Sequence, residues 1–143
     1  MSEENKELHR RVWEEFRGQG RMELADELLA PDFVDHDPNN PEDYRTPEGA
    51  KEELSGYRTA FPDMSATVTD QEAEGDKVTT NWKVTGTHDG DLMGIAPTGK
   101  KIELTGKTVA RIAEGKVAEE WHEWSQEDML RQVGASPSDL QQG

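Results

Sequence analysis

The chain has 143 residues, a hydrophobic fraction of 31% and a formal net charge of −15, from 31 Asp and Glu against 16 Lys and Arg. This length fits one domain with one core, and the acidic charge disfavours partners such as nucleic acid or an anionic membrane. With 0 Cys, disulfides, thiolate metal sites and a cysteine nucleophile are excluded. No segment approaches the ~20 apolar residues of a membrane span, so we expect a cytoplasmic protein.

The first half of the sequence predicts three helices. Apolar residues recur at helical spacing within residues 3–17, and a shorter stripe predicts a second helix over residues 22–29. A short extended segment follows at residues 33–38. Thr46, followed by a proline and an acid, has the form of a helix N-cap, and Pro62 closes the helix that begins there.

The second half predicts an antiparallel meander and one more helix. The strands are expected at residues 64–74, 77–88, 101–113 and 116–124, separated by turn signals, with a short helix at 126–133. Helices followed by a curved antiparallel sheet define an α+β domain in which the helices cover one face of the sheet. We expect a single domain over residues 1–135 and a loose tail at residues 136–143.

Five stretches of the sequence resemble the SnoaL-like members of the nuclear-transport-factor-two superfamily. They are LLAPDFVDHDP (28–38), AFPD (60–63), GTHDG (86–90), GIAPTGK (94–100) and GKVAEEW (115–121). The resemblance implies a cone-shaped barrel, in which a strongly bent, mostly antiparallel sheet wraps around the helices and encloses an apolar pocket. It also implies cofactor-free chemistry and frequent dimerisation through the outer face of the sheet.

The resemblance also points to the positions where relatives carry their chemistry. SnoaL-type cyclases use an acidic residue near the end of the last strand as general acid/base in an intramolecular aldol closure. That position is Ser125 here, and Thr108 stands where family members often carry a histidine. Neither side chain shuttles a proton near neutral pH. Ser125 followed by Asp128 also has the form of a helix N-cap, which is the alternative interpretation.

Strand alternation divides the end of the last strand into two faces. One face holds Glu119, Trp121, Glu123 and Ser125, and the other holds Glu120, His122 and Trp124. If the first face points inward, Glu123 has a raised pKa in an apolar cavity and can act as acid/base, the alternative being a solvated rim. The second face is then the outer one, and burial of Trp124 against a second copy predicts a homodimer.

Two histidines complete the candidates for proton transfer. His36 follows the short extended segment, and His88 ends a strand on the face of Trp82. Each can exchange a proton with a substrate carbonyl group, and a structural histidine is the alternative for each. His9 is expected on a solvated helix face. The expected ligand contacts are Trp82, Trp121, Tyr57, Thr108 and Ser125.

No metal and no cofactor are expected. Residues 94–101 read GIAPTGKK, close to a phosphate-binding loop, but Lys101 replaces the required Ser or Thr and a strand follows instead of a helix. Asp35, His36 and Asp37 are consecutive residues that point in different directions, so they do not form a metal site by themselves.

These observations support three hypotheses. The first is a cofactor-independent acid/base enzyme, of the cyclase, isomerase or hydratase kind, that acts on a hydrophobic carbonyl or ester compound. The second is a non-catalytic small-molecule-binding protein of the same fold that has lost the cyclase carboxylate, as Ser125 and Thr108 suggest. The third, a dimeric interaction module, has only the fold in its favour.

Overall fold

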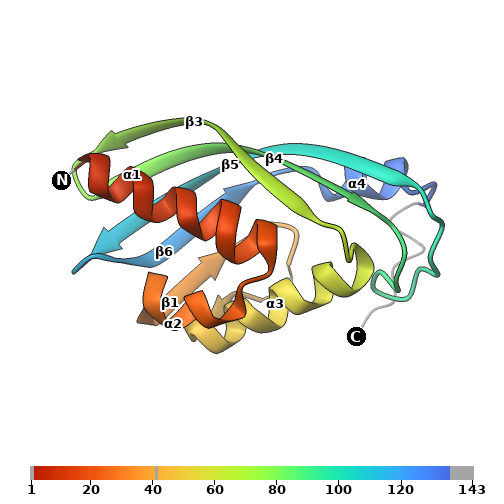
Figure 1. Ribbon diagram of the computed structural model, residues 1–143, viewed down its shortest axis with the longest axis horizontal. Helices are drawn as coiled ribbons and strands as arrows, with labels where there is room; N and C mark the ends of the chain where they lie inside the picture. The colour runs from red at the N-terminus through yellow and green to blue at the C-terminus, as the bar shows by residue number, and fades with distance from the viewer. Residues whose placement is uncertain (1, 41, 136–143) are drawn as a thin grey trace.

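A six-stranded sheet forms the frame of the molecule (Figure 1), and the computed structural model describes residues 2–40 and 42–135. The strands are β1 (Leu29–His36), β2 (Tyr44–Arg45), β3 (Ser65–Glu74), β4 (Lys77–Thr87), β5 (Lys101–Ala113) and β6 (Lys116–Glu123). Their order in the sheet is β2-β1-β6-β5-β4-β3. β1 pairs with β6 in parallel, while β3 to β6 form the antiparallel meander that the sequence predicts.

The helices pack against one face of this sheet (Figure 1). They are α1 (Ser2–Arg11), which continues into the π-helical turn η1 (Val12–Arg17), then η2 (Met22–Leu24), α2 (Ala25–Leu28), α3 (Thr46–Ala60) and α4 (Gln126–Gln132). The predicted α+β class and helix order are confirmed. The extended segment begins earlier than expected, at Leu29, and the bent sheet is not closed into a barrel. The predicted tail at residues 136–143 lies outside the described residues.

Two apolar clusters fill the space between helices and sheet. The first is built around Phe16, Leu28 and Phe33, where α2 and α3 meet β1. The second is built around Trp13 and Trp82 and includes residues of β3, β4, β5 and α4. The turn η1 contributes side chains to both clusters and so connects them.

A β-bulge in β6 decides which of its side chains face the core. Ile112 pairs with Val117, but the next residue of β5, Arg111, pairs with Glu119. Ala118 is therefore an extra residue in β6, and both Val117 and Ala118 are buried. Because side chains alternate with a period of two, one inserted residue moves every later side chain of the strand to the opposite face.

The two faces assigned from the sequence are consequently reversed. Glu120 is 0% exposed and His122 lies on the face of the sheet that the helices cover, whereas Trp121 is 37% exposed. The expectation that Glu120, His122 and Trp124 form an outer dimer surface is wrong, because these side chains point toward the helices. A homodimer through the outer face stays a prediction, and that face carries Trp121 and Glu123 instead.

Candidate active site

A cavity of about 100 Å³ lies between the inner face of the sheet and the helices η1, α3 and α4. Its apolar wall consists of Trp13, Leu54, Phe61, Met64, Trp82, Val84, Ile102, Leu104, Trp124 and Met129. Its polar groups come from Arg17, Asp37, Glu53, Tyr57 and His122. The cavity therefore combines a largely apolar interior with a few converging charged groups, the composition typical of a small-molecule site.

Trp82 is held in the cavity wall by neighbours in η1 and β5. Its ring stacks on Trp13 with centroids 4.5 Å apart, and its Nε1 donates a hydrogen bond of 3.0 Å to Thr108 Oγ1. The residue opposite Trp82 on β5 is Gly106, and a Cβ atom there would overlap the Trp82 ring. The glycine thus leaves the space in which the indole lies.

We expect Gly106→Ala to lower the free energy of unfolding by about 1–3 kcal/mol, because the added methyl group forces Trp82 out of its position. Urea unfolding measures this loss, and a shift in tryptophan fluorescence reports the displacement. Gly56→Ala is the matched control: a Cβ atom at Gly56 in α3 meets nothing within 4 Å, so helix propensity should make that variant slightly more stable. Unchanged stability of Gly106→Ala would contradict the packing argument.

Four buried charges meet at the inner end of the cavity. Arg17 Nη1 donates a hydrogen bond of 3.1 Å to Glu120 Oε2, and its Nη2 donates to Glu120 Oε1. Asp35, which is 0% exposed, lies with Oδ2 3.5 Å from Arg17 Nη2 and with Oδ1 2.7 Å from His122 Nε2. Neither carboxylate oxygen of Asp35 accepts a hydrogen bond from these groups, so the Asp35 contacts are ion pairs only. Two cations and two carboxylates therefore balance one another away from water.

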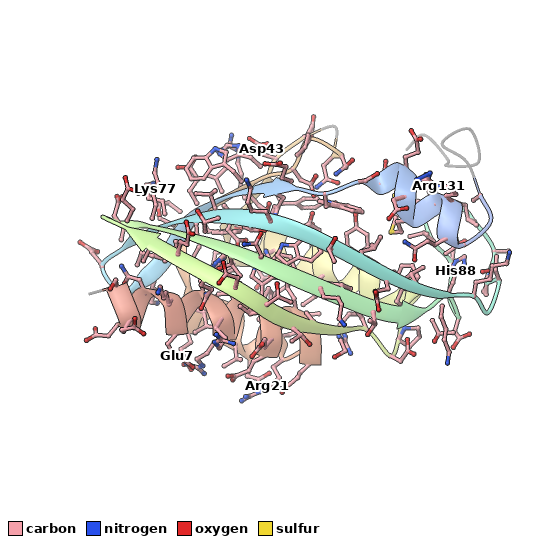
Figure 2. The ribbon with its side chains drawn as sticks, turned by 90° about the horizontal axis from the view of Figure 1, so that it is seen from above. Glu7, Arg21, Asp43, Lys77, His88 and Arg131 are labelled. Carbon is pink, nitrogen blue, oxygen red and sulfur yellow. The ribbon has the colours of Figure 1, made fainter. Side chains whose placement is uncertain are left out.

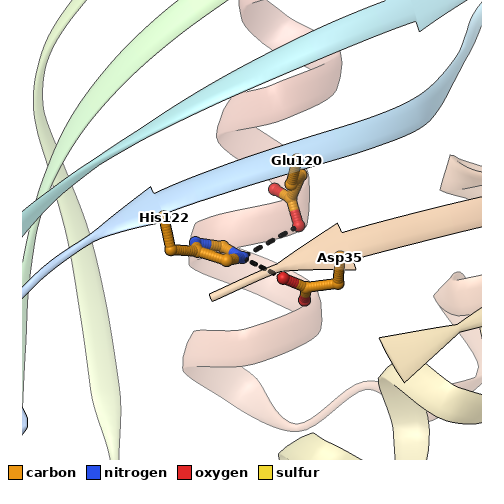
Figure 3. Close-up of side chains that lie close together, drawn as sticks. All are labelled: Asp35, Glu120 and His122. Atoms are coloured by element: carbon orange, nitrogen blue, oxygen red, sulfur yellow. Dashed lines mark ion pairs between the residues drawn. The ribbon is translucent and has the colours of Figure 1, made fainter. Parts of the chain in front are cut away.

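Three side chains of this cluster could in principle hold a metal ion (Figure 3). The potential ligand atoms of Asp35, Glu120 and His122 lie within 4.8 Å of one another. The Arg17 guanidinium contacts both carboxylates. A divalent cation placed between them would face this positive charge and would have to displace the His122 proton. The donor set therefore fits an ion-pair cluster rather than a metal centre.

His9 joins the cluster from α1 and is neutral. It is 0% exposed, and burial lowers its pKa even though Glu120 acts in the opposite direction. A carboxylate only accepts hydrogen bonds, so His9 Nε2 donates to Glu120 Oε2 at 2.6 Å. His9 Nδ1 then accepts from the Thr80 hydroxyl at 2.7 Å. The sequence-based expectation of a solvated His9 is wrong, because this side chain completes the hydrogen bonds of Glu120.

His122 carries a positive charge at neutral pH. Burial alone would lower its pKa, but the carboxylates of Asp35 and Glu120 raise it to about 9. Nδ1 lies 2.7 Å from Thr108 Oγ1, and the hydroxyl can accept from the protonated ring or donate to the neutral one. Because protein groups occupy both ring nitrogens, His122 provides a fixed charge to the cavity rather than a proton to a ligand.

Glu53, by contrast, can exchange a proton within the cavity. Burial raises the pKa of this carboxyl group to about 8, and the nearby Asp35 charge acts in the same direction, against Arg17 and His122. Glu53 Oε2 accepts a hydrogen bond of 2.8 Å from Asn40 Nδ2. Among the described residues no hydrogen bond is made to Oε1, which leaves that oxygen open to a ligand.

Two aromatic side chains of the cavity wall contact each other. Tyr57 and Trp124 meet edge to face with ring centroids 6.3 Å apart. Trp124 Nε1 donates a hydrogen bond of 2.7 Å to Asp37 Oδ2, and Asn39 Nδ2 donates to the Trp124 carbonyl oxygen at 3.1 Å. The segment after β1 thus fixes Trp124 beside Tyr57.

The ligand contacts predicted from the sequence fall into two groups. Tyr57 and Trp82 line the cavity, and Thr108, which is 0% exposed, lies behind them as a partner of Trp82 and His122. Trp121 faces outward, and Ser125 caps α4 by accepting a hydrogen bond of 3.0 Å from Asp128 N. The capping interpretation of Ser125 is confirmed.

The three residues predicted to transfer protons do not line the cavity. Glu123 is exposed on the outer face, with Oε2 3.6 Å from Lys107 Nζ. His36 also lies on the outer face, where Nε2 is 2.6 Å from Glu119 and the ring stacks on Trp121. Acid/base roles were expected for Glu123 and His36 because they were placed in the pocket, and neither residue lies there.

His88 lies at the end of β4, remote from Lys77 at the strand's beginning (Figure 2). It is 0% exposed, packs against Phe61, and its Nδ1 is 3.0 Å from Thr98 Oγ1. These contacts favour the structural alternative, while its buried Nε2 has no hydrogen-bond partner among the described residues.

Arg17 and Glu53 were missed, although helical spacing carried a signal for both. Arg17 lies four residues after Trp13, and Glu53 lies three residues after Ala50 and four before Tyr57. Each charged residue therefore lies on the apolar face of its helix. A charged residue on such a face is the pattern that indicates a buried or functional group.

The bent antiparallel sheet, the helices on its inner face and the cavity between them define a protein of the nuclear-transport-factor-two-like class. The family model of the SnoaL-like polyketide cyclases matches residues 7–133, and the chain belongs to this family. Among curated proteins no sequence matches the chain.

Several solved structures share both fold and sequence with the chain. IdmH of Streptomyces antibioticus, a proposed polyketide cyclase, is 33% identical with a TM-score of 0.80, over 92% of this chain and 99% of IdmH. A proposed polyketide cyclase of Acidithiobacillus ferrooxidans is 30% identical with a TM-score of 0.79, over 92% and 94%. AclR of Streptomyces galilaeus, a proposed hydroxylase, is 27% identical with a TM-score of 0.80, over 96% of this chain and 85% of AclR.

A membrane-spanning helix is not found among residues 2–40 and 42–135, since none of their helices has the length and apolar composition that a span needs.

Proposed function

We propose that the protein is a cofactor-independent acid/base enzyme that binds a hydrophobic carbonyl or ester compound in this cavity. The observation that carries the proposal is Glu53, a carboxyl group with a pKa of about 8 in the wall of an apolar cavity. A group whose pKa lies near the working pH is present in both protonation states, as proton transfer in two directions requires.

The cavity offers complementary contacts for such a ligand. Its apolar wall suits a ring system, and Trp13 Nε1 is a buried donor without a hydrogen-bond partner among the described residues. A carbonyl oxygen would give this donor an acceptor and remove the cost of about 1–3 kcal/mol of leaving it unpaired. The volume of about 100 Å³ is below the ~300–1,000 Å³ of most ligand sites, so a larger substrate must move side chains of the wall aside.

An intramolecular aldol closure uses these groups without any external proton source. The Glu53 carboxylate removes a proton from the carbon next to one carbonyl group, and the resulting enolate forms a C–C bond to a second carbonyl carbon. The alkoxide produced takes the proton back from Glu53. Arg17, which lines the cavity, places positive charge where the oxyanions form. The proposed polyketide cyclases among the relatives support this reaction type, although another relative is described as a proposed hydroxylase.

The proton-transfer step can be tested without knowledge of the natural substrate. We expect the protein to accelerate exchange of the α-protons of 1-indanone for deuterium, followed by NMR, with a rate that rises as pH passes about 8 because the carboxylate of Glu53 is the base. Glu53→Gln should lower this rate by about 10²–10⁴-fold. Glu123→Gln, which removes an exposed carboxylate from the same chain, is the matched control and should retain the rate.

Ser125 and Thr108 favour one alternative, a small-molecule-binding protein that has lost the cyclase carboxylate. If 1-indanone shifts protein resonances but exchanges no faster than in buffer, this alternative holds. Ser125→Asp then decides whether chemistry was lost at that position, since exchange appearing only in the variant indicates a restored catalyst. Because Ser125 caps α4, and aspartate is also a good N-cap, the change should leave the fold intact.

A further inference from the structure

The turn after β1 carries a side chain that contacts the proposed base. Asn40 Nδ2 lies 2.8 Å from Glu53 Oε2, and a carboxylate only accepts hydrogen bonds, so the amide nitrogen is the donor. Among the described residues this is the one hydrogen bond that the Glu53 side chain makes. The two oxygens of its carboxyl group are therefore not equivalent, because one has a protein partner and the other has none.

Other hydrogen bonds of this turn hold Asn40 in place. Its backbone N donates to the Asp37 carbonyl oxygen at 3.0 Å. The Asp37 carboxylate accepts from Asn39 N and Asn39 Nδ2, each at 2.9 Å, and from Trp124 Nε1 at 2.7 Å. These bonds do not depend on a ligand, so the Asn40 amide is pre-organised beside Glu53.

Charged groups face Glu53 from three other elements of the fold. Burial raises its pKa most, and the Asp35 carboxylate of β1 acts in the same direction. Arg17 of η1 and His122 of β6 lower this pKa, and the hydrogen bond from Asn40 lowers it as well. The result is a pKa of about 8. The charges act on the carboxyl group as a whole, whereas the hydrogen bond acts on one oxygen.

Two phenol groups near Glu53 are neutral and add no charge. Burial in the first place, and then the Glu53 carboxylate, raise the pKa of Tyr44 in β2 and of Tyr57 in α3. Both phenols therefore stay protonated over the range in which Glu53 titrates. Among the described residues, Asn40 is thus the group that acts on Glu53 through a hydrogen bond.

We propose that Asn40 is a positioning residue that confines proton exchange to Oε1 of Glu53. The amide engages Oε2, so the neutral acid carries its proton on Oε1. In the proposed aldol closure an Oε1–H bond forms as the substrate C–H bond breaks and its electron pair passes to the carbonyl oxygen. The same Oε1–H group then returns its proton to the alkoxide. The inference rests on the proposed function, because it assigns the working oxygen of that base.

The same hydrogen bond influences the pH at which the base forms. A hydrogen bond to the charged form of a group favours that form, so removal of the Asn40 amide should raise the pKa of Glu53 further. A hydrogen bond to a charged group typically corresponds to about one to two pKa units. At neutral pH the ionised form of Glu53 is already the minority, and such a shift removes most of what remains.

Carboxyl-carbon NMR of protein with isotope-labelled glutamate follows the titration of Glu53, whose resonance is the one that Glu53→Gln removes. In Asn40→Ala we expect the midpoint to rise by about one to two pH units above the wild-type value of about 8. Exchange of the 1-indanone α-protons at pH 7 should be about 10–100-fold slower, with little change in KM. Above the new midpoint the rate should recover only in part, because the carboxyl group is then free to rotate. Asn81→Ala, on the outer face of β4, is the matched control and should keep both midpoint and rate.

A second variant separates this role from a purely structural one. Asn40→Asp keeps the size of the side chain, but an ionised aspartate donates no hydrogen bond and adds a like charge. The midpoint should therefore rise at least as far as in Asn40→Ala, whereas a purely structural role would tolerate the change. This variant also supplies the measurement if Asn40→Ala does not fold. A midpoint that stays unchanged or falls in the Asn40 variants would overturn the proposal.

The wild-type protein reports on the proposed function separately. If it accelerates the exchange of 1-indanone protons while the Asn40 variants titrate and react as it does, the positioning role fails and Glu53 remains the base. If the midpoint rises in the variants but the wild type exchanges 1-indanone no faster than buffer, the hydrogen bond is confirmed. The assignment of a working oxygen then falls together with the proposed function.

Discussion

Arg17→Met is expected to lower the free energy of unfolding by about 3–5 kcal/mol, measured by urea denaturation. The substitution leaves two carboxylates, Glu120 and Asp35, buried at 0% exposure with one cation, His122, to balance them. A typical domain has only about 5–15 kcal/mol of stability in total. The loss should therefore be visible as a large shift of the unfolding midpoint.

The matched control for this prediction is Arg21→Met. Arg21 makes ion pairs with Glu15 and Glu23, but its side chain is 44% exposed. Exposed pairs contribute little, so we expect a change within about 0.5 kcal/mol. If Arg17→Met does not fold, Arg17→Met combined with Glu120→Gln decides the matter, because the double variant removes one charge of each sign. A loss below about 1 kcal/mol in the single variant, or a double variant less stable than the single one, contradicts the ion-pair account.

Stability should also fall as the pH rises from about 6.5 to about 9. The folded protein holds the His122 proton with a pKa of about 9, above the value of about 6.5 for an unperturbed histidine. The folded state therefore binds more protons than the unfolded chain across this window, and its stability decreases with increasing pH. For a shift of this size the loss is about 3 kcal/mol. Glu53, whose pKa is raised to about 8, contributes in the same direction.

Asp35→Asn tests the origin of this pH dependence. Without the Asp35 charge the pKa of His122 should fall, so the part of the decline that His122 causes should shrink, while burial of Glu53 keeps its own part; the variant should also be less stable at neutral pH. His36→Gln is the control, since His36 lies on the outer face, and it should keep the wild-type profile. Stability in urea, measured at several pH values for the three proteins, gives the comparison. A wild-type profile that is flat over this range contradicts a charged His122.

Local sequence determined the elements of this fold. Turn pairs such as Glu114-Gly115 and the alternating apolar residues of β4 and β5 set the strand boundaries, because these signals act over a few residues. The N-cap of α4 at Ser125 was predictable for the same reason. The family resemblance then provided the layer order, and it also made an interior pocket an expectation.

The direction of the side chains of β6 was decided only by tertiary structure. Its two faces each carry an aromatic and an acidic residue, so composition did not distinguish them. The extra residue Ala118 reversed the alternation. A bulge is defined by how β6 pairs with β5, and no sequence pattern within β6 itself indicates it. Burial of Glu120 is tolerated because His9 and Arg17, more than a hundred residues earlier in the chain, supply its hydrogen bonds and counter-charge. Such long-range compensation of a buried charge is a property of the folded arrangement. The candidate acid/base is Glu53 and not Glu123, because Glu123 faces outward and Glu53 lines the cavity.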